Sequence, residues 1–213
     1  MTASRSLVAT VADRYGVEPA KLLATLSATV FSGANTHELM ALLVVADQYH
    51  LNPFTREIYA FRNPRGTGIV PVVSVDGWAK LLNQSPDFDG MQFTDGPLVD
   101  CEGRQVPEWI ECTIHLRGRQ HPVTVREWLD ECYVPPRGEK KLPGPWQTHT
   151  RRMLRHKALV QCARVALGLS GIYDPDEGER IREAEESRVR GKPLVEMPRA
   201  TDDPPAVIEG EAP

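Results

Sequence analysis

The sequence predicts an α+β fold in which helices at both ends of the chain flank a small central antiparallel sheet. Apolar residues recur at helical spacing through the first 49 residues. Residues 56–125 then carry short β-rich runs separated by Gly, Pro and Asn, a pattern typical of hairpins. Helical spacing returns in residues 151–167. Strands grouped between two sets of helices favour segregated layers over alternating βαβ units.

Three helices should precede the first strand. Residues 7–15 form a short amphipathic stretch, and Pro19 stands where a proline in the first turn is tolerated. An apolar stripe follows it, made of Leu22, Leu23, Leu26 and Val30. Thr36 can cap the third helix, which Asn52 and Pro53 should stop.

The central residues predict strands and one further helix. "REIYAF" and "GIVPVVSV" flank the loop "RNPRGTG", so we expect a hairpin whose tip carries Arg62 and Arg65. "DGWAKLLNQ" predicts a short helix. Further strands are expected at 89–93, 108–116 and 121–125, followed by one or two helical turns at 126–133. We interpret five acidic residues as parts of solvated loops: Asp87, Asp89, Asp95, Asp100 and Glu102.

The composition is that of a soluble globular protein, with 41% apolar and 25% charged residues. No apolar run approaches the roughly 18 residues of a membrane span, and no signal peptide is evident, so we expect an intracellular protein. The four cysteines include no C-x-x-C pair. A weak Cys/His pattern, Cys112, His115, His121 and Cys132, leaves a metal site open, but core cysteines are favoured.

Charge is segregated along the chain. Residues 174–213 hold twelve acidic and six basic residues, a net charge of −6, so the first 173 residues carry +2 of the overall −4. Residues 137–173 alone carry +7. A basic body with an acidic tail suggests a polyanionic partner.

The helix predicted at 151–167 is apolar over most of its circumference. The gap is a strip of Lys157, Gln161 and Arg164. A buried cation needs a counter-charge, and no acid on this helix supplies one. We therefore expect the strip to line a groove.

The first turn of the same helix gathers cations: Arg151, Arg152, Arg155 and His156. Helix N-termini already attract anions, so added cations there indicate phosphate binding. The alternative is that these residues pair with acids of the tail or elsewhere. Trp146, just before the helix, could contact a base or simply pack in the core.

Signatures of catalysis are missing from the sequence. There is no G-x-x-x-x-G-K-[ST] phosphate loop, no G-x-S-x-G and no H-E-x-x-H. Asp130 with Glu139, Lys140 and Lys141 imitates a nuclease site, but in a proline-rich loop that could hardly hold a metal rigidly. We expect no enzyme activity and no cofactor; a nuclease is the rival hypothesis.

Four blocks carry a family resemblance: "LLVVADQYHLNPFTREIYAF", "GIVPVVSVDGWAKLLNQSPDFDGMQF", "VREWLDECY" and "GPWQTHTRRMLRHKALVQCARVALGLSGIYDPDEGERI". In this order they resemble the Bet (Redβ) branch of the RecT-like single-strand annealing recombination proteins of phages. The resemblance implies ATP-independent annealing of complementary DNA strands, binding of single-stranded and annealed duplex DNA, and assembly into rings or filaments. The place of action would be the cytoplasm of the bacterial host.

The resemblance also implies a DNA groove. The groove would comprise Arg151, Arg152, Arg155, Lys157, Gln161 and Arg164, with Trp146 at its entrance; Arg56 matches a basic position, and residues 62–65 match a hairpin beside the DNA. We assign DNA binding, annealing and oligomerisation to residues 1–190, and a disordered, acidic, proline-rich tail to 191–213. Relatives continue into a second helical domain associated with a partner exonuclease and host single-strand-binding protein; here recruitment of these two partners would instead use the tail as a short linear segment. The alternative function is passive coating of single strands without annealing.

Overall fold

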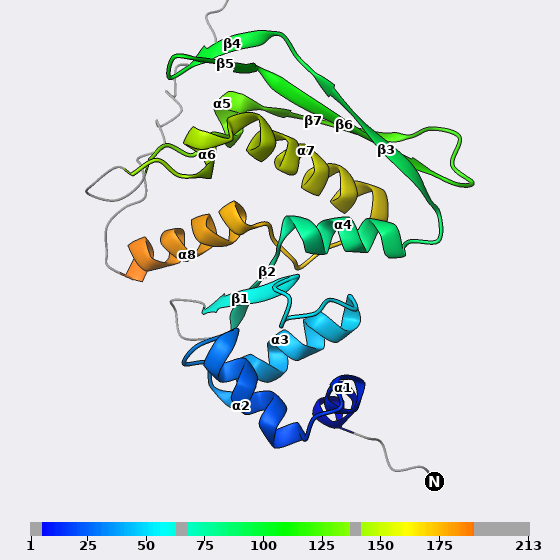
Figure 1. Ribbon diagram of the computed structural model, residues 1–213, viewed down its shortest axis with the longest axis vertical. Helices are drawn as coiled ribbons and strands as arrows, with labels where there is room; N and C mark the ends of the chain where they lie inside the picture. The colour runs from blue at the N-terminus through cyan, green and yellow to red at the C-terminus, as the bar shows by residue number, and fades with distance from the viewer. Residues whose placement is uncertain (1–5, 63–67, 137–141, 190–213) are drawn as a thin grey trace, which may run out of the picture.

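The computed structural model describes residues 6–62, 68–136 and 142–189. At one end lie the N-terminal helices with the hairpin β1 (Ile58–Arg62) and β2 (Ile69–Val73) (Figure 1). At the other end is a three-stranded sheet, which α7 (Thr150–Leu167) crosses on one face. Helices α4 (Val75–Gln84) and α8 (Pro175–Val189) lie between the two ends. The α+β prediction is confirmed.

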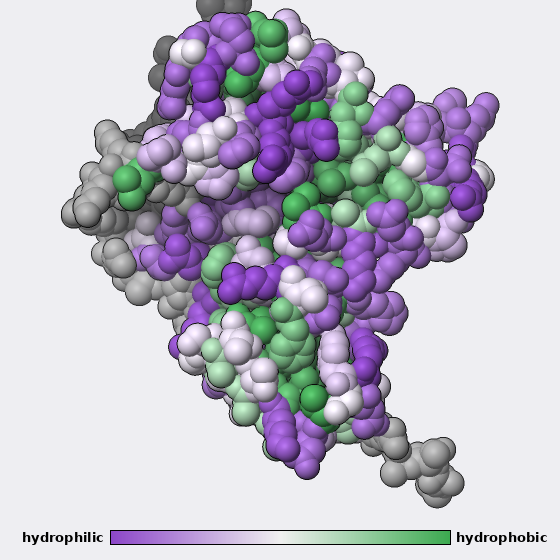
Figure 2. All heavy atoms as spheres, in the orientation of Figure 1, coloured by the Kyte–Doolittle hydropathy of each residue, from purple (hydrophilic) through white to green (hydrophobic). Residues whose placement is uncertain are grey.

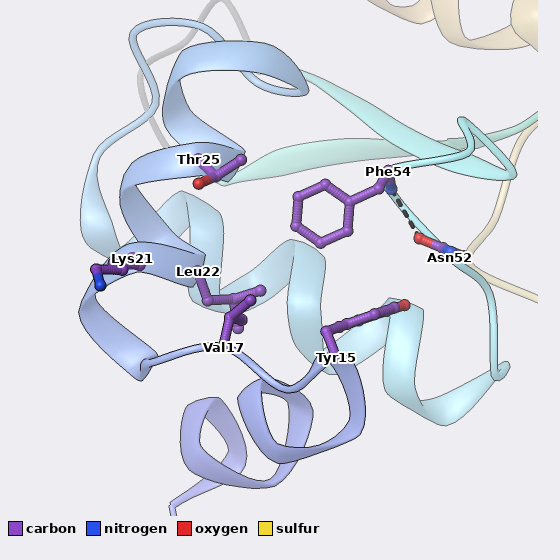
Figure 3. A pocket seen from close by; sticks show the side chains of 7 residues that line it. All are labelled: Tyr15, Val17, Lys21, Leu22, Thr25, Asn52 and Phe54. Atoms are coloured by element: carbon purple, nitrogen blue, oxygen red, sulfur yellow. Dashed lines mark hydrogen bonds between the residues drawn. The ribbon is translucent and has the colours of Figure 1, made fainter.

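The three predicted N-terminal helices are present as α1 (Leu7–Tyr15), α2 (Pro19–Thr29) and α3 (Thr36–Gln48). The cap of α3 lies one residue earlier than expected, because Asn35 and Glu38 form a capping box. Figure 3 shows Tyr15 of α1 and Phe54 near one another, and their rings meet edge to face at 5.3 Å.

The strands form three separate antiparallel sheets rather than one central sheet. The expected hairpin β1–β2 is one of them. The three-stranded sheet has the order β3 (Phe88–Asp95), β6 (Trp109–Leu116), β7 (Val123–Trp128). The third is an unpredicted hairpin of β4 (Leu98–Cys101) and β5 (Arg104–Pro107), turning at Glu102 and Gly103, which both have positive φ. The acids predicted to lie in loops therefore fall partly in strands.

Two short helices, α5 (Leu129–Cys132) and α6 (Pro145–Thr148), lead into α7. Leu154, Ala158 and Cys162 of α7 are fully buried, which accounts for its apolar sequence. The helix ends at Gly168, whose φ of 65° is readily adopted only by glycine.

Helix α8 is rich in charged residues, and its start is fixed to the β1–β2 hairpin. The backbone N–H of Val73 donates to the carbonyl of Tyr173 at 2.8 Å. A Cβ at Gly178 would lie 2.5 Å from the Val72 side chain, so only glycine permits this approach. The segment 173–178 thus joins the hairpin to the rest of the core.

Hydrophobic side chains reach the surface among the N-terminal helices, in the lower half of Figure 2, within a largely hydrophilic surface. Across the described part of the chain, none of the helices combines the length and the apolar character that crossing a membrane requires.

Candidate nucleic-acid interface

The start of α7 is fixed by hydrogen bonds around Thr150, which is buried. Arg104 of β5 donates to the Thr150 hydroxyl at 2.8 Å, and that hydroxyl donates to the carbonyl of Trp146 at 2.6 Å. These contacts hold the first turn of α7 against the β4–β5 hairpin. The side chains that radiate from this turn therefore start from a fixed backbone.

Three exposed arginines of this turn, Arg151, Arg152 and Arg155, border one open hollow of about 870 Å³. The opposite wall is the end of β3, with Phe93, Thr94 and Asp95. We call these three arginines the arginine face. Its cations therefore border one shared open space.

The three arginines have different surroundings. Arg151 forms an ion pair with Asp95. The Arg155 guanidinium lies over the ring of Phe93, 4.9 Å from its centroid. Among the described residues, no acid pairs with Arg152. Within the described part of the chain, the face therefore offers one cation without an acidic partner, one stacked cation and one paired cation.

His156 adjoins the arginine face and is half-buried. Burial lowers the pKa of its imidazole from the usual 6.5, and the charges of Arg155 and Arg152 lower it further. The side chain is therefore neutral at pH 7. A phosphate near these arginines would offset their effect on the imidazole.

The strip formed by Lys157, Gln161 and Arg164 finds its counter-charges on another segment of the chain. Lys157 and Gln161 line a small opening of about 170 Å³ together with Asp174 and Glu177, and binding of DNA by the strip stays a prediction. Lys157 is buried, with its Nζ 2.6 Å from Asp174 and 3.0 Å from Asp176. The counter-charges come from the start of α8. They lie 10 to 20 residues further along the chain, where a helical wheel of α7 alone cannot show them.

The other two strip residues, Gln161 and Arg164, bind Glu177 of α8. Arg164 contacts both carboxylate oxygens, at 2.9 and 2.7 Å, and the Gln161 amide donates to one of them at 3.0 Å. Hydrogen bonding to Glu177 raises the pKa of Arg164. Burial alone would raise the pKa of Glu177, but Arg164 lowers it below its usual value. We call Lys157, Gln161 and Arg164 with Asp174, Asp176 and Glu177 the α7–α8 ion network.

Trp146 has the packing role, because only 4% of it is exposed. Its indole N–H donates to Asp176 at 3.1 Å, and its ring meets Tyr133 edge to face. A base could not stack on this ring without a rearrangement of the core. Trp146 thus supports the ion network.

Comparisons with known proteins identify the family of this chain. A model of the RecT family matches residues 18–95 and 101–189. Over 189 residues the chain is 48% identical to the Recombination protein bet of Escherichia phage lambda; the alignment covers 85% of this chain and 68% of that protein. The chain belongs to the RecT family. The resemblance inferred from the sequence is confirmed.

Other basic positions of this RecT-family chain lie apart from the arginine face. Arg56 is exposed in the turn before β1, with a positive φ of 58°. Arg62 donates to Glu38 at 3.2 Å, and in Figure 1 its strand lies on the other side of α8 from α7. Arg65 lies outside the described residues. Of these positions, the two that the structure describes, Arg56 and Arg62, do not line the hollow.

Sequence reasoning missed that β3 contributes residues to the lining of the hollow. The alternation of Met91, Phe93 and Asp95 along one strand face was the available signal. No local pattern pairs Asp95 with an arginine 56 residues later.

The described residues give little support for a metal site or for nuclease chemistry. Of the residues that the structure describes, no group of three His, Cys, Asp or Glu side chains is placed to hold a metal ion. Glu139, Lys140 and Lys141 of the nuclease hypothesis are not among them. The pocket of about 280 Å³ in Figure 3 is lined mainly by apolar side chains, and its Lys21 pairs with Glu18 at 3.1 Å.

Proposed function

We propose that the arginine face binds the phosphate backbone of single-stranded DNA, and that this chain, a single-strand annealing protein of the RecT family, pairs complementary strands there during phage recombination. The observation that carries the proposal is the set of three exposed arginines bordering one open hollow. Guanidinium groups bind phosphate oxygens through paired, charge-assisted hydrogen bonds.

Backbone contacts suit annealing because annealing must work on any sequence. Phosphate contacts carry no sequence information, and they leave the base edges free to find partners. Arginines on one strand also reduce the repulsion that a second strand meets. The face should therefore hold a strand while leaving its bases available.

We further propose that the chain needs neither ATP nor a catalytic step of its own. Base pairing and stacking supply the free energy of annealing, about 1.4 kcal/mol per base-pair step. The protein then has only to bring strands together and hold the product. This assignment agrees with membership in a family of annealing proteins.

The proposal extends to assembly and partners. Repetition of the arginine face in a ring or filament would turn weak single-site contacts into strong binding along a strand. Annealed duplex DNA would remain bound to such an assembly. A phage exonuclease and the host single-strand-binding protein are the proposed protein partners, and the host cytoplasm the proposed place of action.

A mixing experiment tests the function. The purified protein is incubated with one fluorophore-labelled oligonucleotide, and a quencher-labelled complement is added without ATP. Faster quenching than in buffer, with a larger protein–duplex complex in gel shifts, is expected. Tight single-strand binding without faster quenching would instead indicate passive coating. Cleavage of the labelled strand in Mg²⁺ or Mn²⁺ would indicate a nuclease.

A further inference from the structure

The hollow at the arginine face contains an acid where a DNA-binding surface would be expected to have none. Asp95 stands at the end of β3, and it is the one acidic residue among the six that line the hollow. Its carboxylate forms an ion pair with Arg151. A carboxylate and a phosphate present similar oxygens to a guanidinium, so Asp95 occupies the kind of contact that DNA would make.

We propose that Asp95 competes with DNA phosphate for Arg151 and thereby limits the affinity of the arginine face for DNA. This inference rests on the proposed function. Asp95 is anchored by a strand that is paired with β6, whereas the Arg151 side chain is long and 69% exposed. If Arg151 turns to a phosphate, Asp95 is left unpaired near a second anion. If Arg151 stays, DNA has one contact fewer.

The other two arginines show what Asp95 changes. Arg155 stacks on Phe93, which orients its guanidinium and leaves its N–H edge open to a ligand. No acid in the described chain pairs with Arg152. These two can therefore bind phosphate directly. Of the three, Arg151 is the one paired with an acid among the described residues, so Asp95 should reduce the number of effective phosphate contacts.

A limited affinity fits the annealing reaction. A strand held by every available cation would exchange slowly and sample complementary sequences slowly. An internal acid weakens each contact without removing the cationic surface that attracts DNA. Asp95 would thus favour rebinding and sampling over static coating.

The same strand provides a matched control. Asp89 also lies on β3 and also pairs with an arginine, Arg117, at 3.3 Å. Neither Asp89 nor Arg117 lines the hollow. Asp89→Asn and Asp95→Asn remove the same charge from the same strand, so a difference between them reports the local contact.

The experiment measures binding of a fluorescent oligo-dT to the full chain at several salt concentrations. Asp95→Asn should bind about three- to tenfold more tightly than wild type, whereas Asp89→Asn should change affinity less than about twofold. The salt dependence for Asp95→Asn should steepen by about 0.7 in log–log slope, which corresponds to one more phosphate contact.

Arg151→Gln completes the test. In an Arg151→Gln background, Asp95→Asn should give a smaller gain, because no arginine remains to be released. Unchanged affinity of Asp95→Asn, an equal gain from Asp89→Asn, or an equal gain without Arg151 would each overturn the inference. Arg152→Gln is measured in parallel: wild-type binding by this variant would show that the proposed DNA site itself is wrong, whereas weaker binding confines a failure to Asp95.

Discussion

We predict that His156 makes DNA binding by this chain sensitive to pH. Burial and the charges of Arg155 and Arg152 lower its pKa in the free protein. Phosphates bound at the arginines would remove much of that charge effect, so the pKa should be higher in the complex. A group whose pKa rises on binding takes up a proton, and affinity then increases as pH falls.

We expect the affinity for oligo-dT to increase as pH is lowered through the region below 6.5, the usual pKa of histidine. His156→Gln should remove part of that increase while keeping binding at pH 7.5 or above within about twofold of wild type. Fluorescence anisotropy titrations of both proteins over this range measure the effect. Identical pH profiles would contradict this role of His156.

The α7–α8 ion network joins two helices, and we expect Lys157 to stabilise the fold through it. Burial alone would lower the pKa of Lys157, but Asp174 and Asp176 raise it above its usual value. Its contribution to stability is therefore complete at neutral pH and is lost only as pH rises through the raised pKa. Glu177 has a lowered pKa, so its contribution is lost only under acid conditions.

Lys157→Met should lower the free energy of unfolding by about 3 kcal/mol, because it leaves two carboxylates without their buried partner. Urea unfolding measures the change. The control is Arg152→Gln, which removes an exposed cation of the same helix and should leave stability within about 0.5 kcal/mol of wild type. A fully stable Lys157→Met that has lost DNA binding would show instead that Lys157 acts in a groove.

Elements formed by local sequence patterns were predictable, whereas long-range pairs were not. The N-terminal helices, the β1–β2 hairpin and α7 follow from periodicity and turn residues. The β4–β5 hairpin was missed because each of its strands has only four residues, too few for a clear alternation of apolar and polar side chains. At the site, the exposure of the three arginines was predictable from their position in the first turn. The acids that pair with Lys157 and Arg164 lie at the start of α8 and just before it, so a helical wheel of α7 alone could not show them.

Across the whole molecule, the cations of α7 fall into two functional groups. Those of the first turn border an open hollow, and those further along are neutralised by α8, whose start is fixed to the β1–β2 hairpin. The ion network therefore connects the two ends of the molecule, and the arginine face remains for DNA. We therefore expect the arginine face, and not the ion network, to determine DNA binding by this helix.

The rate of strand annealing by Arg152→Glu tests whether the arginine face binds DNA. Its control is Lys21→Glu, which reverses an exposed charge on α2, among the N-terminal helices. Circular dichroism first verifies that both variants are folded. We predict that Arg152→Glu lowers the rate of fluorescence quenching without ATP by at least about tenfold. The rate of Lys21→Glu should stay within about twofold of wild type. A wild-type rate for Arg152→Glu, or an equal loss in both variants, would contradict the assignment of DNA binding to the arginine face.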